Sequence, residues 1–125
     1  NYAISTAIHI RYPRIGQGES TSAIHAARIR TSDTVDAPAA EKIARALDTW
    51  RDGMDGRAAA LAVADRLDAL YTKLGMPTRV RQLEIPREDF PKIAADTVKN
   101  FNANAGARSP DAQVADALRL LDAAY

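Results

Sequence analysis

Apolar residues recur every three or four positions along most of this chain, which is the spacing of one face of an α-helix. The clearest run closes the chain: Val114, Leu118, Leu121 and Tyr125. Before this run, Ser109 suits a helix N-cap and Pro110 suits the first helical position. A helix that begins at Ser109-Pro110 and buries this apolar face is therefore predicted.

Two further helices are predicted in the first half of the chain. One follows Asp36-Ala37-Pro38, a cap candidate and an early proline, and its apolar positions are Ile43, Leu47 and Trp50. The glycines within residues 52–56 end it. The next helix extends from about residue 57 to residue 74, with an apolar stripe formed by Val63, Leu67, Leu70 and Leu74.

The connector after residue 74 contains signals that stop one helix and start another. Gly75 suits the left-handed residue that closes a helix, and Pro77 prevents the helix from resuming. Glu88 and Asp89 stand between Pro86 and Pro91, where the free amides of a helix N-terminus favour carboxylates. A further helix is predicted to contain Phe90, Ile93, Ala94, Thr97 and Phe101 and to end in residues 102–106.

The first 35 residues have a weaker pattern. Residues 3–8 are compatible with a short helix or a strand, because the run is too short for periodicity to decide. The prolines and glycines of residues 12–18 predict a loop, residues 22–30 could form a helix, and residues 31–34 form a polar linker. We therefore divide the chain into an N-terminal segment, 1–35, and an all-α bundle domain of four or more amphipathic helices, 36–125.

Composition excludes several classes of protein. The chain has 125 residues, a single domain's length, and no cysteine, which rules out disulfides and zinc–thiolate sites and fits a reducing, cytoplasmic setting. Seventeen basic residues against sixteen acidic ones leave a net charge of +1, so no overall field favours nucleic acid or membranes. No apolar run approaches the roughly 18 residues of a membrane span.

His9 and His25 are the candidate metal ligands, because neutral imidazole binds divalent iron or zinc. The alternative is that each histidine bonds a backbone carbonyl. A site of three or four ligands within this chain would need carboxylates such as Glu19 or Asp33, so an autonomous metalloenzyme is not expected.

Other patterns point to structural roles. The pair Gly16-x-Gly18 lacks the third glycine of a dinucleotide-binding turn. The hydroxyls of residues 20–22 near His25 suggest a nucleophile and base, but such residues usually form caps and turns. The arginines of the N-terminal segment could hold phosphate or nucleic acid, although a solvated or interface face is favoured: Arg11, Arg14, Arg28 and Arg30. Trp50 and Tyr71 fall on or beside helical stripes and are interpreted as core.

Several motifs in order resemble one known family. They are the Ala37-Pro38-Ala39 helix start, the Gly75–Arg79 turn, the run Ile85-Pro86-Arg87-Glu88-Asp89-Phe90-Pro91, and the closing Leu120-Leu121-Asp122-Ala123-Ala124-Tyr125. Over residues 37–125 the chain resembles the C-terminal helical domain of iron-containing (group III) alcohol dehydrogenases, which have a dehydroquinate synthase-like architecture.

The resemblance implies an oxidoreductase that transfers a hydride between an alcohol or carbonyl and NAD or NADP. Such an enzyme holds Fe²⁺ or Zn²⁺, bound by an aspartate and three histidines, in a cleft between this domain and an N-terminal nucleotide-binding domain. Two of those histidines would lie just upstream of the Ala37-Pro38-Ala39 start, where Gln17-Gly18 stands at the expected histidine–glycine turn.

The resemblance thus leaves His9 and His25 as the metal candidates and assigns no catalytic or cofactor-binding residue. The nucleotide-binding domain and a homo-oligomer are the expected partners. The isolated chain is expected to be inactive and need hold no cofactor of its own. A non-catalytic helical interaction module is the alternative, and an arginine-mediated nucleic-acid binder is a weaker third.

Overall fold

The computed structural model describes residues 2–100 and 108–125, and within these ranges the fold is all-α, with no strand. Six helices follow one another: α1 (Tyr2–Arg11), α2 (Gln17–Thr31), α3 (Ala37–Ala46), α4 (Gly56–Lys73), α5 (Phe90–Lys99) and α6 (Pro110–Ala123). Two short 3₁₀ turns lie between α4 and α5: η1 (Val80–Leu83) and η2 (Arg87–Asp89). The predicted all-α class is therefore confirmed.

The predicted helix starts and stops are confirmed at three positions. The Asp36 side chain accepts a hydrogen bond from the Ala39 amide at 3.1 Å, and Ser109 accepts one from Ala112 at 3.3 Å. Gly75 has a φ of +70°, the left-handed conformation that closes α4. These signals are local, so they act in the same way whatever surrounds the helix.

Two predicted boundaries are wrong. The helix after Asp36 was expected to include Leu47 and Trp50, but α3 ends at Ala46, because Asp48 adopts a φ of +58° and Thr49 donates its amide to the Ala44 carbonyl at 2.8 Å. This backbone reversal closes a helix as a glycine would.

The second error concerns α2, which begins at Gln17 rather than Ser22, so Gly18 is helical. Glu19 explains this start, since its carboxylate accepts the Gly16 amide at 2.7 Å, in a capping arrangement. Residues 3–8, left open between helix and strand, lie in α1. Phe101 and the predicted helix end at 102–106 lie outside the described residues.

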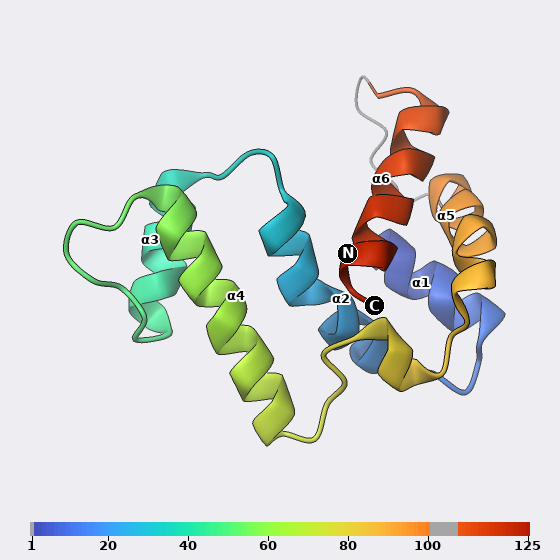
Figure 1. Cartoon of the computed structure of the whole chain (residues 1–125), viewed down its shortest axis with the longest axis horizontal. Helices are drawn as coiled ribbons and strands as arrows, with labels where there is room; N and C mark the ends of the chain where they lie inside the picture. Colours follow the sequence, from blue (N-terminus) through green and yellow to red (C-terminus); the bar gives the residue numbers. More distant parts are fainter. Residues whose placement is uncertain (1, 101–107) are drawn as a thin grey trace.

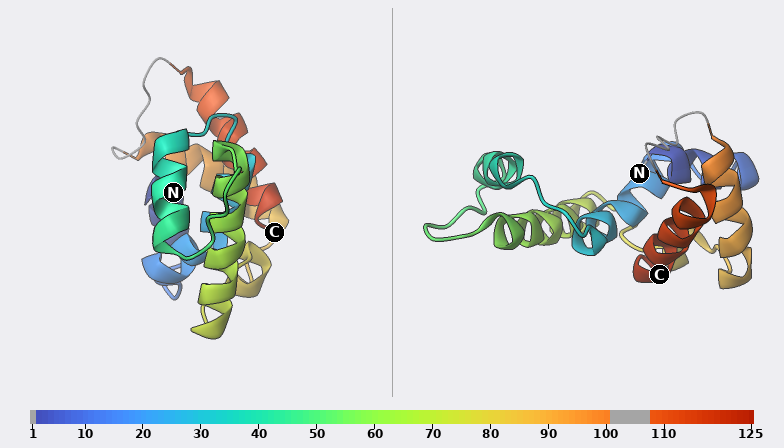
Figure 2. Two further views of the ribbon diagram at one scale, coloured as in Figure 1. Left: turned by 90° about the vertical axis from the view of Figure 1, so that its left-hand side faces the viewer. Right: turned by 90° about the horizontal axis from the view of Figure 1, so that it is seen from above.

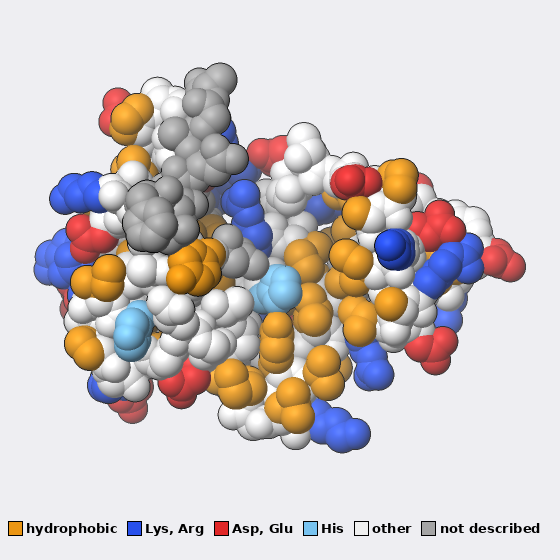
Figure 3. Space-filling view, turned by 180° about the vertical axis from the view of Figure 1, so that it is seen from behind, with side chains coloured by type: hydrophobic (Ala, Val, Ile, Leu, Met, Phe, Trp, Pro, Cys, Tyr) orange, Lys and Arg blue, Asp and Glu red, His pale blue; other side chains and the backbone are white. Residues whose placement is uncertain are grey.

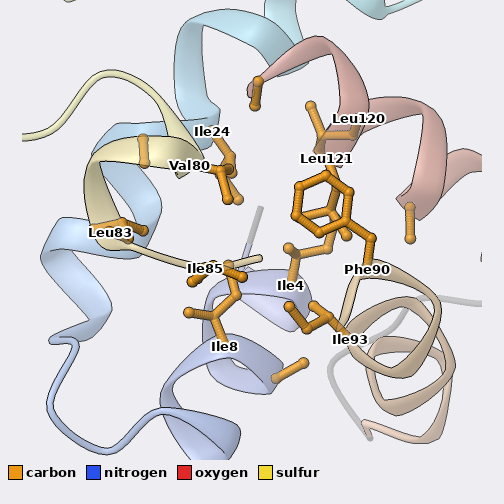
Figure 4. Close-up of a cluster of buried hydrophobic side chains, with 14 of the residues drawn as sticks. Ile4, Ile8, Ile24, Val80, Leu83, Ile85, Phe90, Ile93, Leu120 and Leu121 are labelled. Carbon is orange, nitrogen blue, oxygen red and sulfur yellow. The ribbon is translucent and has the colours of Figure 1, made fainter. Parts of the chain in front are cut away.

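The larger of two apolar clusters joins the two ends of the chain. Side chains from α1, α2, the η1 region, α5 and α6 point toward one another in Figure 4: Ile4, Ile8, Ile24, Val80, Leu83, Ile85, Phe90, Ile93, Leu120 and Leu121. The Ala124 carbonyl also accepts the Val80 amide at 2.8 Å. Part of the N-terminal segment is thus packed in the same core as the C-terminal helices. The division at residue 35 stays a prediction.

A smaller cluster holds α3 and α4 together. The two helices run side by side in the same direction, with the start of α4 at Gly56 against the start of α3 at Ala37 (Figure 1). The buried members of the cluster are four alanines and one valine: Ala40, Ala44, Ala59, Ala60 and Val63. Leu47, Trp50 and Leu67 pack on it from the α3–α4 pair and its connecting loop, and Ile29 and Val35 from α2 and the linker that follows. Figures 1 and 2 show the consequence: the α3–α4 pair lies on one side, α1, α5 and α6 lie on the other, and α2 passes between them.

Candidate functional site

His9 lies on α1 and is oriented by the loop that follows that helix. Its Nδ1 is 2.7 Å from the Ile15 carbonyl oxygen. A carbonyl can only accept, so Nδ1 carries the proton and Nε2 of the neutral ring keeps its lone pair. Metal-binding histidines commonly have this arrangement, which fixes the tautomer and leaves the other nitrogen for the metal. His9 can therefore supply one ligand atom.

His25 lies on α2 and pairs with Tyr71 of α4. The Nδ1 of His25 is 2.9 Å from the Tyr71 hydroxyl, and the two ring centroids are 6.1 Å apart. Burial lowers the pKa of His25 and raises that of Tyr71, so both rings are neutral at pH 7. Tyr71 was predicted to be a core residue. In the structure it is half-buried, and its hydroxyl orients the His25 ring.

The candidate ligands do not gather into a complete metal site. Within residues 2–100 and 108–125, no three side chains from histidine, cysteine, aspartate and glutamate lie together. The carboxylates that could have completed a site are engaged elsewhere, since Glu19 caps α2 and Asp33 pairs with Arg119 at 3.0 Å. His9 and His25, drawn in pale blue in Figure 3, lie apart on one face. Their role as ligands stays a prediction.

The hydroxyls near His25 have structural partners. Ser20 donates to the carbonyls of Gly16 and Gln17, and Ser22 donates to that of Glu19 at 2.9 Å. The His25 ring bonds the Tyr71 hydroxyl rather than a serine. These contacts support the interpretation of the serines as residues that bond the helix backbone.

Ion pairs neutralise most of the basic N-terminal segment. Three of its four candidate arginines face carboxylates: Arg11–Asp96 at 2.7 Å, Arg14–Glu84 at 3.6 Å, and Arg30 with Asp65 and Asp68. Arg28 makes no ion pair with any residue that the structure describes. Among its described arginines, the segment therefore offers one unpaired guanidinium rather than a phosphate-binding row.

One apolar surface of the molecule lies beside His25. The α4 stripe is buried at Val63, half-buried at Leu67 and Leu70, and 64% exposed at Leu74. In Figure 3 hydrophobic side chains, drawn in orange, gather over the centre and right of the view, and a histidine lies at their edge. We call residues Leu67, Leu70, Tyr71 and Leu74 the α4 apolar face. Because this face is exposed to solvent in part, only the first part of the apolar stripe of α4 is buried in the core.

A separate cavity of about 270 Å³ lies between the C-terminal end of α2, the following linker, α3 and α4. The sequence did not predict this cavity, because its walls come from residues 28–43 and residues 60–63, which only the packing of the helices brings together. The spacing of residues along any one helix contains no signal for it.

None of the helices in the described ranges is long and apolar enough to span a membrane. The model of the Fe-containing alcohol dehydrogenase family, C-terminal, matches residues 2–125. This range is wider than residues 37–125, over which the motifs were recognised, and includes α1 and α2. Comparison with curated proteins and with solved structures found no significant match.

Proposed function

Because the chain belongs to the Fe-containing alcohol dehydrogenase family, as its C-terminal domain, we propose that it forms the helical part of a metal- and NAD(P)-dependent alcohol dehydrogenase or carbonyl reductase. The family match over almost the whole chain is the observation that carries this proposal. The domain would act together with a nucleotide-binding domain, and the reaction is hydride transfer between an alcohol or carbonyl and the nicotinamide. The cysteine-free sequence fits a cytoplasmic enzyme.

The described residues do not form a metal site by themselves, so the proposal assigns the chain a partial contribution. In the complete enzyme the metal, iron or zinc, would polarise the substrate oxygen. His9 is the better candidate for one ligand, since its Nδ1 proton is held by the Ile15 carbonyl. His25 can contribute Nε2 only if Tyr71 accepts from its Nδ1.

The α4 apolar face supports the expectation of a partner domain. Apolar side chains half-buried or exposed along one helix stripe would lose contact with water if another domain covered them. This face lies next to the His25–Tyr71 pair. A nucleotide-binding domain seated there would enclose one of the two candidate ligands at the domain boundary.

The decisive experiment compares this chain alone with the same chain joined behind the nucleotide-binding domain of a family enzyme. NADH and NADPH oxidation with short aldehydes and bound iron or zinc are measured for both proteins. The chain alone is expected to show neither activity nor stoichiometric metal, and the joined protein is expected to show both. A joined protein that binds NADH but holds no metal and oxidises no cofactor would contradict the proposal.

The candidate ligands are tested in the joined protein. His9→Ala and His25→Ala are compared by elemental analysis after dialysis, with Gln113→Ala on α6 as the control. Loss of metal in a histidine variant, with NADH binding intact, would assign that residue as a ligand. Unchanged metal content in both variants would remove them from the site.

A non-catalytic helical interaction module is the second candidate, since exposed apolar side chains such as Leu74 could equally bind a partner protein. The two hypotheses differ in self-association. A domain whose apolar surface normally contacts another domain should self-associate when isolated. The contacts would involve exposed apolar side chains, including Leu74 and Ile10, which is 70% exposed. Sedimentation equilibrium is expected to show concentration-dependent association that Leu74→Gln reduces. A strictly monomeric chain would favour the independent module.

A further inference from the structure

The cavity between α2, its following linker and the α3–α4 pair has the features of a small-molecule site. Most of its wall is aliphatic, built from Ile29 and Val35 on one side and from Ala39, Ala60 and Val63 on the other. Its volume of about 270 Å³ is just below the range of drug-sized ligand pockets, so it would take a smaller molecule. Ile43 lines it and is 48% exposed, so an apolar side chain stands at its opening.

Arg28 supplies a charged group at this apolar cavity. It lines the cavity from the last part of α2, and it has no carboxylate partner within the described part of the chain. Arg30, two residues further on, is held by both Asp65 and Asp68. Arg28 is therefore the guanidinium that remains available to a ligand here, and a guanidinium binds a carboxylate through two parallel hydrogen bonds.

The charged groups around the cavity do not remove the preference of Arg28 for a carboxylate ligand. Asp36 also lines the cavity, but its carboxylate accepts the Ala39 amide at the positive end of the α3 dipole. Arg57 donates to the carbonyls of Arg30 at 2.7 Å and Ser32 at 3.1 Å, which places a second guanidinium beside the cavity linker. Asp33, next to that linker, is paired with Arg119.

We propose that this cavity binds a small monocarboxylic acid with an aliphatic body, whose carboxylate pairs with Arg28 and whose chain lies among Val35, Ala39 and Val63. Burial of the aliphatic chain gains the usual hydrophobic free energy, and the ion pair orients the molecule. A phosphate or nucleic acid would use the cation but leave the aliphatic walls unfilled. The site includes neither His9 nor His25, so it is independent of the proposed dehydrogenase chemistry.

The test uses the 125-residue chain and octanoate as the probe, with amide NMR shifts as the readout and no metal or nicotinamide present. Saturable shifts are expected at residues of α3 and of the linker 32–36. Arg28→Gln is expected to weaken octanoate binding about tenfold. Arg81→Gln, which removes an exposed arginine from η1 instead, is the matched control and should leave binding unchanged.

Two further measurements separate the charge from the cavity. Octanol, which has the same chain without the carboxylate, should bind as weakly to the natural protein as octanoate binds to Arg28→Gln. Ala39→Leu should fill the cavity and abolish binding while the rest of the spectrum is retained. Three results would each overturn the proposal. They are equal affinity for octanol and octanoate, a loss of octanoate affinity in Arg81→Gln as large as that in Arg28→Gln, and octanoate-induced amide shifts at residues outside the cavity. Because the readout is binding alone, an inactive dehydrogenase would leave this result unaffected.

Discussion

At the scale of single residues, Gly56 and Gly18 both lie in the first turn of a helix but have opposite surroundings. A Cβ on Gly56 would be 2.6 Å from the Ala37 Cβ and 2.8 Å from its Cα, because the starts of α3 and α4 touch there. A Cβ on Gly18 in α2 would meet nothing within 4 Å. Gly56 is thus needed for close packing, whereas Gly18 is not.

We predict that Gly56→Ala destabilises the protein by about 1–3 kcal/mol, although alanine is the better helix former, since backbone would have to shift. Gly18→Ala, the matched control, should be neutral or stabilise by about 0.5 kcal/mol. Urea unfolding followed by circular dichroism measures both. A stable Gly56→Ala protein would show that α3 and α4 do not approach each other in this way.

The His25 pKa makes stability depend on pH in a defined direction. Burial lowers this pKa in the folded chain below its ordinary value, so the unfolded chain binds more protons between the two pKa values. We predict that the free energy of unfolding falls as the pH is lowered through this window and that the His25 contribution levels off below the folded pKa. His25→Gln should reduce the slope of the urea midpoint between pH 7 and 5. An unchanged slope would contradict a half-buried, neutral His25.

At the scale of elements, one carboxylate ties α4 to α2 and to the turn before η1. The side chain of Asp68 is 18% exposed and pairs with Arg30 at 2.8 Å and with Arg79 at 3.2 Å. Asp65, one turn earlier, also pairs with Arg30 but is 76% exposed. The two aspartates have the same chemistry and differ in burial and in the number of partners.

Asp68→Ala is expected to destabilise the protein by about 1–2 kcal/mol, because it leaves two guanidinium groups facing each other without their shared partner. The control Asp65→Ala should change stability by less than about 0.5 kcal/mol, as exposed ion pairs do. Thermal unfolding at low and at 0.5 M salt measures the difference. If both variants behave alike, the Arg30–Asp68–Arg79 network does not join these elements.

At the scale of the whole molecule, the described residues form two apolar clusters of unequal size. The larger contains isoleucines, leucines and a phenylalanine from both ends of the chain, whereas the buried members of the smaller are four alanines and Val63. Buried apolar area sets the hydrophobic stabilisation, so the α3–α4 pair has less of this stabilisation. The helices of the molecule should therefore not all open together.

Hydrogen exchange of the natural protein tests whether α3 and α4 open more readily than the rest of the molecule. Amides of α3 are expected to exchange at least about tenfold faster than those of α6, through local opening of the α3–α4 pair. Addition of octanoate should slow α3 selectively if the cavity is occupied. Uniform protection of α3 and α6 would show a single cooperative unit instead.

The local chemistry of the sequence determined most of the helices and several of their ends. The caps at Asp36 and Ser109 and the left-handed Gly75 act through neighbouring amides and carbonyls, so no tertiary information is needed to predict them. The order of short motifs after residue 37 was likewise enough to recognise the family that the comparison confirms.

Only the tertiary structure decided what lies beside what. It packs α1 against α2 and α5, brings His25 to Tyr71 across 46 positions of sequence, and places Arg28 at an open cavity. It also places Glu19 in a helix cap and Asp33 in an ion pair. Contacts between distant residues depend on how helices pack, and a pattern of spacing along one helix contains no information on which partner its face will meet.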